Sequence, residues 1–238
     1  MNYETEVKKY KEFCEKYFSK FKGKTFLENK KAIIKTFQII SLFFILKDYD
    51  ISDNKNLPLL SKMSIDTLFD ILISIPIGDS LFFSACSRQF AEELLELVYT
   101  EYCNKKISEK DLLALNYRKL WQDGIQKSIK YKLLSSKDMK GNLREKSKLD
   151  SINFIFKSNS DKLHFKNQNI STTQYLEQII NGKKYDSKII IRNINKFHLF
   201  CIDLLPIILK IDIDKMSIVQ RKNYLHLINS LALYETFK

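Results

Sequence analysis

The sequence predicts an all-α protein, and both its composition and its apolar periodicity point to that fold class. Only five glycines and three prolines occur among the 238 residues, whereas average usage is about 7% and 5%. So few turn signals favour long helices over many short strands. Because 45% of the residues are apolar and 13% are aromatic, the chain can bury a sizeable core. We expect a bundle of about eight helices.

The longest helical pattern covers Ser80–Tyr102, and we expect the bundle to be organised around it. Its apolar residues recur three, four and seven positions apart, which is typical of a helix sunk into a core. Gly78 ahead of this run is a helix breaker, and Asp79 and Ser80 are good N-cap candidates. The apolar stripe comprises Leu81, Ala85, Leu95, Tyr99 and Tyr102.

Arg88 and Glu92 lie on this apolar stripe, where charged side chains are unexpected because burial of a charge is costly. One interpretation is an ion pair between residues four apart at the edge of the core. The other is that Arg88 faces a polar cleft that this helix helps to form. The cleft interpretation expects Ser158–Lys166 on the opposite wall, with Glu92 holding the guanidinium towards a phosphate.

Further helices are predicted ahead of Ser80. Glu4–Phe21 carries aromatic residues on one face and lysines on the other, which indicates an amphipathic opening helix. Thr25–Lys47 is apolar nearly all round in its second half, so we expect it to be buried on several sides. Pro58 begins another helix that stops near Pro76–Gly78.

The middle of the chain adds a helix, a polar loop and a second helix. The segment after Ser108 resembles a capping box followed by a helix, with Gly124 near its bend or end. Ser135–Leu143 is predicted to be an exposed loop, and Leu143–Phe156 to be a helix. We expect the whole chain to form a single helical domain, and any subdivision of it falls near residues 134–142.

The last third of the chain alternates polar and apolar segments. Ser158–Thr173 is a long polar stretch that we expect to be a loop, and loops that interrupt a helical core tend to carry function. Ser171–Ile180 is predicted to be a short helix. A longer helix covers Ser187–Leu209 with a kink at Pro206, and a final helix covers about Lys215–Phe237.

Cysteine spacing and hydropathy limit which cellular compartment and which cofactors are expected. The four cysteines show no C-x-x-C spacing, which predicts a reduced, cytoplasmic setting. Isolated cysteines and histidines offer no metal site, and we expect no cofactor. The N-terminus has no apolar signal segment, and the apolar runs Ile39–Leu46 and Ile71–Ile77 fall short of the roughly 20 residues that cross a bilayer. We expect no membrane association.

The formal net charge of +12 suits an anionic partner such as nucleic acid. Asn104–Asp150 holds 13 Lys or Arg against six Asp or Glu, which is seven of the excess charges. This segment is a candidate backbone-binding surface, although a solvated helical hairpin or a Lys-rich composition explains the charge equally well. The candidate nucleic-acid-binding residues are Lys127, Lys130, Lys132, Lys137, Lys140 and Arg144.

Two pairs of arginine and histidine have spacings with chemical meaning. Arg192 precedes His198 by six residues, and Arg221 precedes His226 by five. Such pairs fit metal-free RNA cleavage, in which a histidine with a pKa near neutrality moves a proton and an arginine stabilises charge on the phosphate. The alternative is that each histidine is a hydrogen-bonded core residue, because residues five or six apart on a straight helix point away from each other.

Two short motifs carry a resemblance to a known family. SACSRQFAEELLELVY contains R-x-x-x-E, and FKSNSDKLHFKN contains S-x-x-x-H-F, with a basic helical segment between them. Over roughly residues 78–200 the chain resembles bacterial HEPN-like proteins. Arg88 and Glu92 match the early helix of that family, and Ser160 and His164 match its later segment. Active members carry R-x4-6-H, and here Arg192 with His198 matches that spacing on a different helix, because no arginine lies five to seven residues before His164.

The resemblance implies an all-α, HEPN-like core with an RNA-directed role, frequently in phage defence or toxin–antitoxin systems. It implies a homodimer that brings two active segments together across one cleft. It also implies a metal-independent ribonuclease that uses His164 with Arg88, or Arg192 with His198. The alternative class is a non-catalytic helical module that binds nucleic acid or a partner protein through Asn104–Asp150. A third reading is a structural subunit of a larger defence complex.

Overall fold

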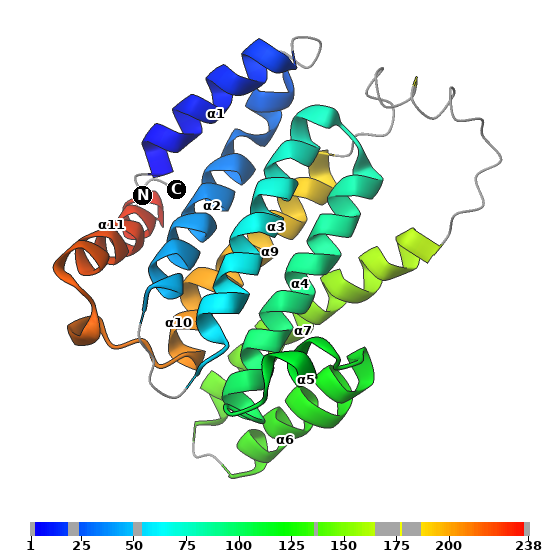
Figure 1. The fold of residues 1–238 in the computed structure, drawn as a ribbon, viewed down its shortest axis with the longest axis vertical. Coiled ribbons are helices and arrows are strands. Elements are labelled where there is room, and N and C mark those ends of the chain that lie inside the picture. The colour runs from blue at the N-terminus through cyan, green and yellow to red at the C-terminus, as the bar shows by residue number, and fades with distance from the viewer. Residues whose placement is uncertain are drawn as a thin grey trace.

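The computed structural model describes residues 3–18, 24–49, 54–135, 138–164, 177 and 187–235. Within these residues the regular secondary structure is helical and no strand occurs, which confirms the all-α prediction (Figure 1). The helices are α1 (Tyr3–Tyr17), α2 (Lys24–Lys47), α3 (Leu57–Ile77), α4 (Ser80–Tyr102), α5 (Glu109–Leu113), α6 (Gln126–Ser135), α7 (Met139–His164), α9 (Ser187–Asp203), α10 (Leu205–Ile208) and α11 (Ile218–Glu235), with a π-helix, η2 (Arg118–Ile125), and a 3-10 turn, η3 (Ile213–Lys215).

Helices α2, α3 and α4 stand side by side, and each runs antiparallel to its neighbour along the chain (Figure 1). α2 also packs against α9, and α4 packs against α7. α1 and α11 cover α2 from outside, while η2 packs on α4. The apolar residues all round the second half of α2 predicted this central position.

Three phenylalanine rings join the central helices. The ring centroid of Phe90 on α4 lies 5.8 Å from that of Phe43 on α2 and 4.8 Å from that of Phe197 on α9. Both pairs meet edge to face, the arrangement that aromatic quadrupoles favour. All three side chains are fully buried. These rings therefore join α2, α4 and α9 within a core that also takes residues from α3, α7 and η2.

The corner between α3 and α4 follows the local sequence closely. Gly78 adopts the left-handed conformation at φ 72°, and its N–H donates to the carbonyls of Ser74 and Ile75. Asp79 then caps α4, because its carboxylate accepts hydrogen bonds from the N–H groups of Leu81 and Phe82 at 2.8 and 3.3 Å. The predicted bounds of α4 are confirmed at both ends.

The single helix predicted after Ser108 is instead two elements. α5 ends after Leu113, and the Asn116 side chain accepts a hydrogen bond from the N–H of Lys119 at 3.0 Å to begin the next element. That element is the π-helix η2, in which the N–H of Gln126 donates to the carbonyl of Trp121. Gly124 is the residue before the last of η2, so the bend or end predicted near Gly124 corresponds to the change from η2 to α6 after Ile125.

Helix α7 begins earlier and ends later than the predicted helix, so residues 158–164 are helical rather than a loop. Their polar side chains bond to their own helix. The Asn159 amide donates to the carbonyl of Ile155 at 2.9 Å, and the Ser160 hydroxyl donates to that of Phe156 at 2.8 Å. Residues 165–176, which include the rest of the expected loop, lie outside the described residues. The predicted helix 171–180 is described only at Glu177, which is helical.

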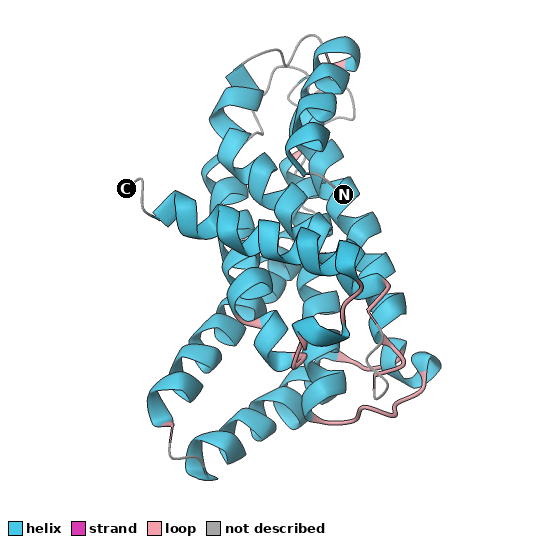
Figure 2. Ribbon diagram, turned by 90° about the vertical axis from the view of Figure 1, so that its left-hand side faces the viewer, coloured by secondary structure: helices cyan, strands magenta, loops and turns pink. Residues whose placement is uncertain are grey.

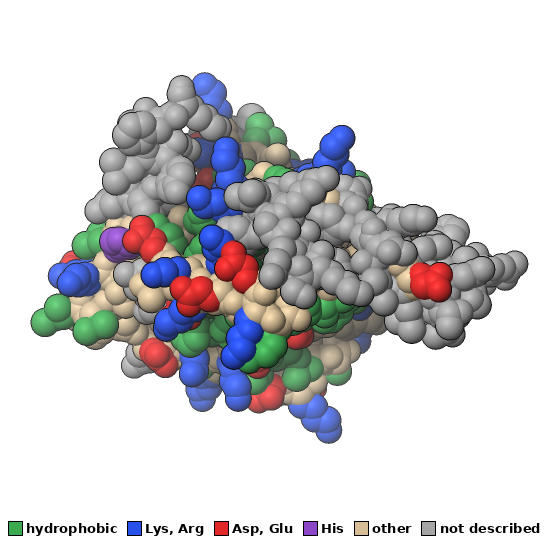
Figure 3. All heavy atoms as spheres, turned by 90° about the horizontal axis from the view of Figure 1, so that it is seen from above, with side chains coloured by type: hydrophobic (Ala, Val, Ile, Leu, Met, Phe, Trp, Pro, Cys, Tyr) green, Lys and Arg blue, Asp and Glu red, His purple; other side chains and the backbone are tan. Residues whose placement is uncertain are grey.

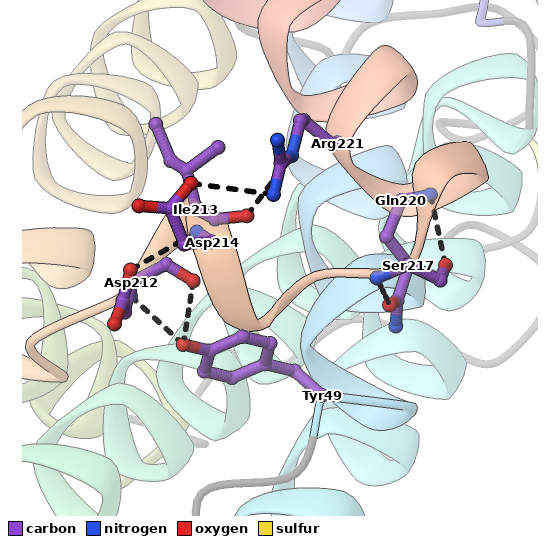
Figure 4. Close-up of polar contacts among 7 residues, drawn as sticks. All are labelled: Tyr49, Asp212, Ile213, Asp214, Ser217, Gln220 and Arg221. Carbon is purple, nitrogen blue, oxygen red and sulfur yellow. Dashed lines mark hydrogen bonds and ion pairs between the residues drawn. The ribbon is translucent and has the colours of Figure 1, made fainter.

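The C-terminal segments differ from the predicted kinked helix and its successor. α9 ends at Asp203 and α10 begins at Leu205, because Pro206 lacks the N–H that a continuous helix needs. Figure 4 shows how η3 and the start of α11 are fastened. The Tyr49 hydroxyl donates to the carbonyl of Asp212 at 3.0 Å and accepts from its N–H at 2.8 Å. Ser217 and Gln220 form a capping box, which starts α11 at Ile218.

Among the described residues, none of the helices combines the length and the apolar composition that a bilayer span requires. The suggested dividing point near residues 134–142 coincides with the connection between α6 and α7. Beyond that connection, α7 packs against both α4 and α9.

The close approach of Gly124 to α4 gives a test of the η2 packing. A Cβ on Gly124 would lie 2.6 Å from Cε2 of Tyr99 and 3.0 Å from the carbonyl oxygen of Lys119. Gly124→Ala should therefore lower the free energy of unfolding by about 1–3 kcal/mol in chemical denaturation, despite the better helix propensity of alanine. Gly141→Ala is the matched control, because its Cβ meets only the exposed Asp138 carboxylate, which can move away at the cost of its 3.0 Å hydrogen bond from the Gly141 N–H, so it should destabilise less than Gly124→Ala. An unchanged denaturation midpoint for Gly124→Ala would contradict this account.

Candidate functional site

Arg88 of α4 lies against α7 in a defined geometry. Its Nε donates a hydrogen bond to the Ser160 hydroxyl at 2.9 Å, and its Nη2 lies 3.5 Å from a carboxylate oxygen of Glu92. The guanidinium carbon lies 5.0 Å from the ring centroid of Phe156. About a third of the Arg88 side chain, 35%, remains exposed. Arg88 is thus oriented on three sides and open on another.

Aromatic rings continue this arrangement across α7. The ring of Phe156 stacks on that of Tyr117, with centroids 5.0 Å apart and an interplanar angle of 5°. The Tyr117 hydroxyl donates to the Asn153 amide oxygen at 2.6 Å, and the ammonium of Lys157 lies 5.5 Å from the Tyr117 centroid. Two cations therefore flank two stacked rings, which fixes the plane of the Phe156 ring beneath Arg88. We call Arg88, Glu92, Tyr117, Phe156 and Ser160 the Arg88 surface.

His164 follows Ser160, a residue of the Arg88 surface, closely in the sequence. It is the last residue of α7, four residues and so about 6 Å along the helix axis beyond Ser160. Its side chain lies outside the described part of the structure. The sequence analysis expected Ser158–Lys166 opposite Arg88, and the hydrogen bond between Arg88 and Ser160 brings those two segments into contact. The ion pair of the other interpretation is also present, between Arg88 and Glu92.

Arg192 and His198 are not brought together. His198 is buried on α9, where a ring nitrogen lies 2.8 Å from the amide oxygen of Gln38 on α2. Burial, and then the charge of Lys35, lowers the pKa of His198 to about 4. Arg192 is exposed on the same helix. His198 is therefore neutral at pH 7 and shielded from solvent, which favours the alternative interpretation of a hydrogen-bonded core residue over the predicted catalytic role.

Arg221 and His226 are also separated by their contacts. The Arg221 Nε donates to the carbonyl of Ile213 at 3.2 Å, and its Nη2 lies 3.3 Å from a carboxylate oxygen of Asp214 (Figure 4). The ring of His226 lies 5.9 Å from that of Tyr3 on α1. These residues fasten η3 and α1 to α11.

The predicted basic surface divides into paired and unpaired cations. Lys127 pairs with Asp123 at 3.1 Å, and Lys132 pairs with Glu145 at 3.2 Å. Lys137 lies outside the described residues. The remaining three of the six candidates are exposed and have no carboxylate partner in the part of the chain that the structure describes: Lys130, Lys140 and Arg144.

These unpaired cations lie on the hairpin formed by α6 and α7, which projects from the lower end of the bundle (Figure 2). Tyr131 and Leu134 of α6 are also exposed there, at 72% and 77%. At the opposite end of the molecule, acidic and basic side chains of the described residues are interspersed (Figure 3).

Two buried glutamates of α4 escaped the sequence analysis. Glu93 is 1% exposed and accepts hydrogen bonds from Thr67 at 2.7 Å and Gln89 at 3.1 Å. Burial raises the pKa of Glu93 to about 7, and it raises the pKa of Glu96 to about 8 with help from Glu92 and Glu93. Carboxylates three and four residues apart on a core-facing helix were the signal in the sequence.

Metal ligands do not gather among the described residues. No group of three or more histidine, cysteine, aspartate or glutamate side chains is placed there to hold an ion. Cys86 and Cys201 are buried thiols, Cys14 is partly buried, and Cys103 is exposed. Burial raises the pKa of the Cys86 thiol to about 12, so it stays protonated at neutral pH.

The raised pKa of Glu96 predicts the sign of a pH effect on stability. The folded protein keeps a proton on Glu96 that the unfolded chain releases above pH 4.5, so the free energy of unfolding falls as the pH rises from 4.5 towards 8. Glu96→Gln should leave stability nearly unchanged at pH 4.5 and raise it by about 2–4 kcal/mol at pH 9. Denaturation at both pH values measures this, with the exposed Glu12→Gln as control. An equal effect of Glu96→Gln at both pH values would contradict the assignment.

Comparison of the chain with protein-family models, with curated proteins and with solved structures found no match. The resemblance to HEPN-like proteins therefore stays a prediction that rests on Arg88, Glu92, Ser160 and His164.

Proposed function

We propose that this chain is an RNA-directed, HEPN-like protein that uses the Arg88 surface to hold a phosphate of RNA. The observation that supports the proposal is the hydrogen bond from Arg88 to Ser160, because it joins the two motifs on which the resemblance rests. The two residues are 72 positions apart in the chain. This juxtaposition is expected only if α4 forms one wall of a cleft.

The chemistry of the Arg88 surface suits a phosphate. Ser160, Glu92 and Phe156 hold the guanidinium in one plane, and its exposed part retains N–H donors for a bidentate contact. Glu92 lies 3.5 Å away, a distance beyond a short charge-assisted hydrogen bond, so it orients Arg88 without consuming its donors. A preorganised cation of this kind loses little conformational entropy when an anion binds.

In the catalytic form of the proposal, the protein is a metal-independent ribonuclease. His164, one turn beyond Ser160, moves a proton of the 2′-hydroxyl or of the leaving group, while Arg88 stabilises negative charge on the phosphate. A homodimer brings two such surfaces to one cleft, and the setting is a cytoplasmic defence or toxin–antitoxin system. Arg192 and His198 take no part, because His198 is buried.

The second candidate is a non-catalytic module that binds nucleic acid, or a partner protein in a larger defence complex. The observation that favours it is the set of unpaired, exposed cations on the α6–α7 hairpin. Cations without carboxylate partners are free to replace the counterions of a phosphate backbone. This candidate needs neither His164 nor Arg88.

Arg88→Lys tests the first candidate, because lysine keeps the charge but not the bidentate geometry. We expect a melting temperature close to that of the wild type and RNA binding or cleavage reduced about tenfold or more. Binding is measured by fluorescence anisotropy with a single-stranded RNA oligonucleotide, and cleavage on gels in the presence of EDTA. Arg118→Lys on η2 is the control, since Arg118 is largely exposed and pairs with Asp123.

The same assays separate a catalytic role from a structural one. His164→Ala should abolish cleavage and retain RNA binding if His164 moves the proton. A loss of stability in Arg88→Lys, with RNA interaction that follows the folded fraction, would assign Arg88 a structural role only. Wild-type melting together with wild-type RNA interaction in Arg88→Lys would remove the proposal.

The second candidate predicts a salt effect. Replacing Lys130, Lys140 and Arg144 together by glutamine should reduce the slope of log affinity for single-stranded RNA against log salt by about 2, because each phosphate contact contributes about 0.7. The matched control replaces three exposed lysines of the C-terminal segments, Lys210, Lys215 and Lys222. Equal slopes for the two triple variants would show that the hairpin does not bind the backbone.

A further inference from the structure

An open groove of about 420 Å³ lies between α7 and α9, away from the Arg88 surface. Small-molecule sites range from about 300 to 1,000 Å³, so the groove has the size of a small-ligand site. It is lined by Leu143, Lys146, Ser147, Asp150, Ser151 and Phe154 of α7 and by Lys196 of α9, and we call these residues the α7–α9 groove.

The groove uses a different face of α7 from the one that meets Arg88. Leu143, Ser147, Ser151 and Phe154 recur at helical spacing and so share one side of α7. Residues two apart on a helix point in nearly opposite directions, so the exposed Phe154 and the buried Phe156 lie on opposite sides. The groove and the Arg88 surface are therefore separate places on the molecule.

The floor of the groove is aromatic and open. Phe154 is 52% exposed and Leu143 is 51% exposed. The ammonium of Lys196 lies 4.7 Å from the Phe154 ring centroid. Lys196 covers one face of the Phe154 ring, and the exposed remainder of the ring is a platform on which a nucleobase can stack, because every base has a π-face.

The α9 side of the groove carries uncompensated positive charge. Burial, and then the charge of Arg192 one turn earlier, lowers the pKa of Lys196. No carboxylate of the described residues pairs with Arg192 or Lys196. The carboxylate that lines the groove, Asp150, is neutralised within it by its ion pair with Lys146, and Asp203 pairs with Lys148 at 2.9 Å. An anion beside Arg192 and Lys196 would relieve their mutual repulsion.

Two serines of α7 also line the groove. The Ser151 hydroxyl donates to the carbonyl of Ser147 at 3.0 Å, which leaves its oxygen lone pairs as acceptors. The Ser147 hydroxyl also lines the groove. The groove thus holds a stacking ring, the Lys196 ammonium and two serines, and Arg192 lies one turn from Lys196 on α9. These groups match the base, phosphate and sugar of a nucleotide.

We propose that the α7–α9 groove binds a single nucleotide unit. The base stacks on Phe154, the phosphate lies by Lys196 and Arg192, and the sugar hydroxyls face Ser147 and Ser151. The unit is either a free nucleoside monophosphate or one residue of a single-stranded RNA. This site does not depend on the Arg88 surface, since it requires neither His164 nor cleavage.

The test measures binding of two probes to the full chain. Adenosine 5′-monophosphate is titrated by calorimetry, and a labelled single-stranded RNA oligonucleotide by fluorescence anisotropy. Phe154→Ala and Lys196→Gln should each weaken binding at least fivefold, as expected for a lost stacking or phosphate contact. Two matched controls should leave it unchanged: Leu199→Ala, a half-exposed apolar residue of α9, and Lys222→Gln, an exposed lysine of α11. Melting curves confirm that the variants are folded.

Each outcome decides for or against the groove. If Phe154→Ala and Lys196→Gln weaken binding of the monophosphate alone, the ligand is a free nucleotide. If they weaken binding of the RNA alone, the ligand is a residue of an RNA strand. Weakening for both supports the groove for either source. Wild-type protein that binds neither probe, or Phe154→Ala and Lys196→Gln proteins that bind like the controls, would overturn the proposal. Arg88→Lys should not alter monophosphate binding, so failure of the RNA proposal is distinguishable from failure of the groove.

Discussion

The burial of Phe90 between Phe43 and Phe197 is the contact on which the rest of the structure depends. It ties α4 to α2 and α9 through edge-to-face rings, and it fixes the rotation of α4 about its own axis. Residues two apart on a helix point in nearly opposite directions, so an inward Phe90 turns Arg88 towards α7. The Arg88 surface is thus a consequence of how the core is packed. The burial of Phe90 directs Arg88 towards α7, and the hydrogen bond to Ser160 holds it there.

The helices of the first half were predictable because their ends are encoded locally. Pro58 lies in the first turn of α3, Gly78 supplies the left-handed residue that ends it, and Asp79 supplies the cap of α4. Each of these signals acts within a few residues, so no knowledge of the fold is needed to interpret it. The central position of α2 was equally predictable, because a helix that is apolar on every side is buried on every side.

The second half was harder to predict because its decisive partners are distant in the chain. Gly124 is required by the ring of Tyr99, and Ser160 of the polar segment meets Arg88, 72 positions away in the chain. The hydrogen-bond partner of the buried His198 ring is Gln38, 160 positions away in the chain. The contact of Arg88 with Ser160 was anticipated from motifs, whereas the groove beside Phe154 was not, since the sequence does not say which face of α7 meets α9.

The single tryptophan of the chain, Trp121, gives η2 an optical label of its own. It is 4% exposed and belongs to an element that packs on α4 and α6. Its emission therefore reports on the packing of η2, whereas far-ultraviolet circular dichroism reports on every helix. If the two signals are followed through the same transition, their coincidence or separation distinguishes a chain that unfolds as one cooperative unit from one in which η2 detaches before the bundle.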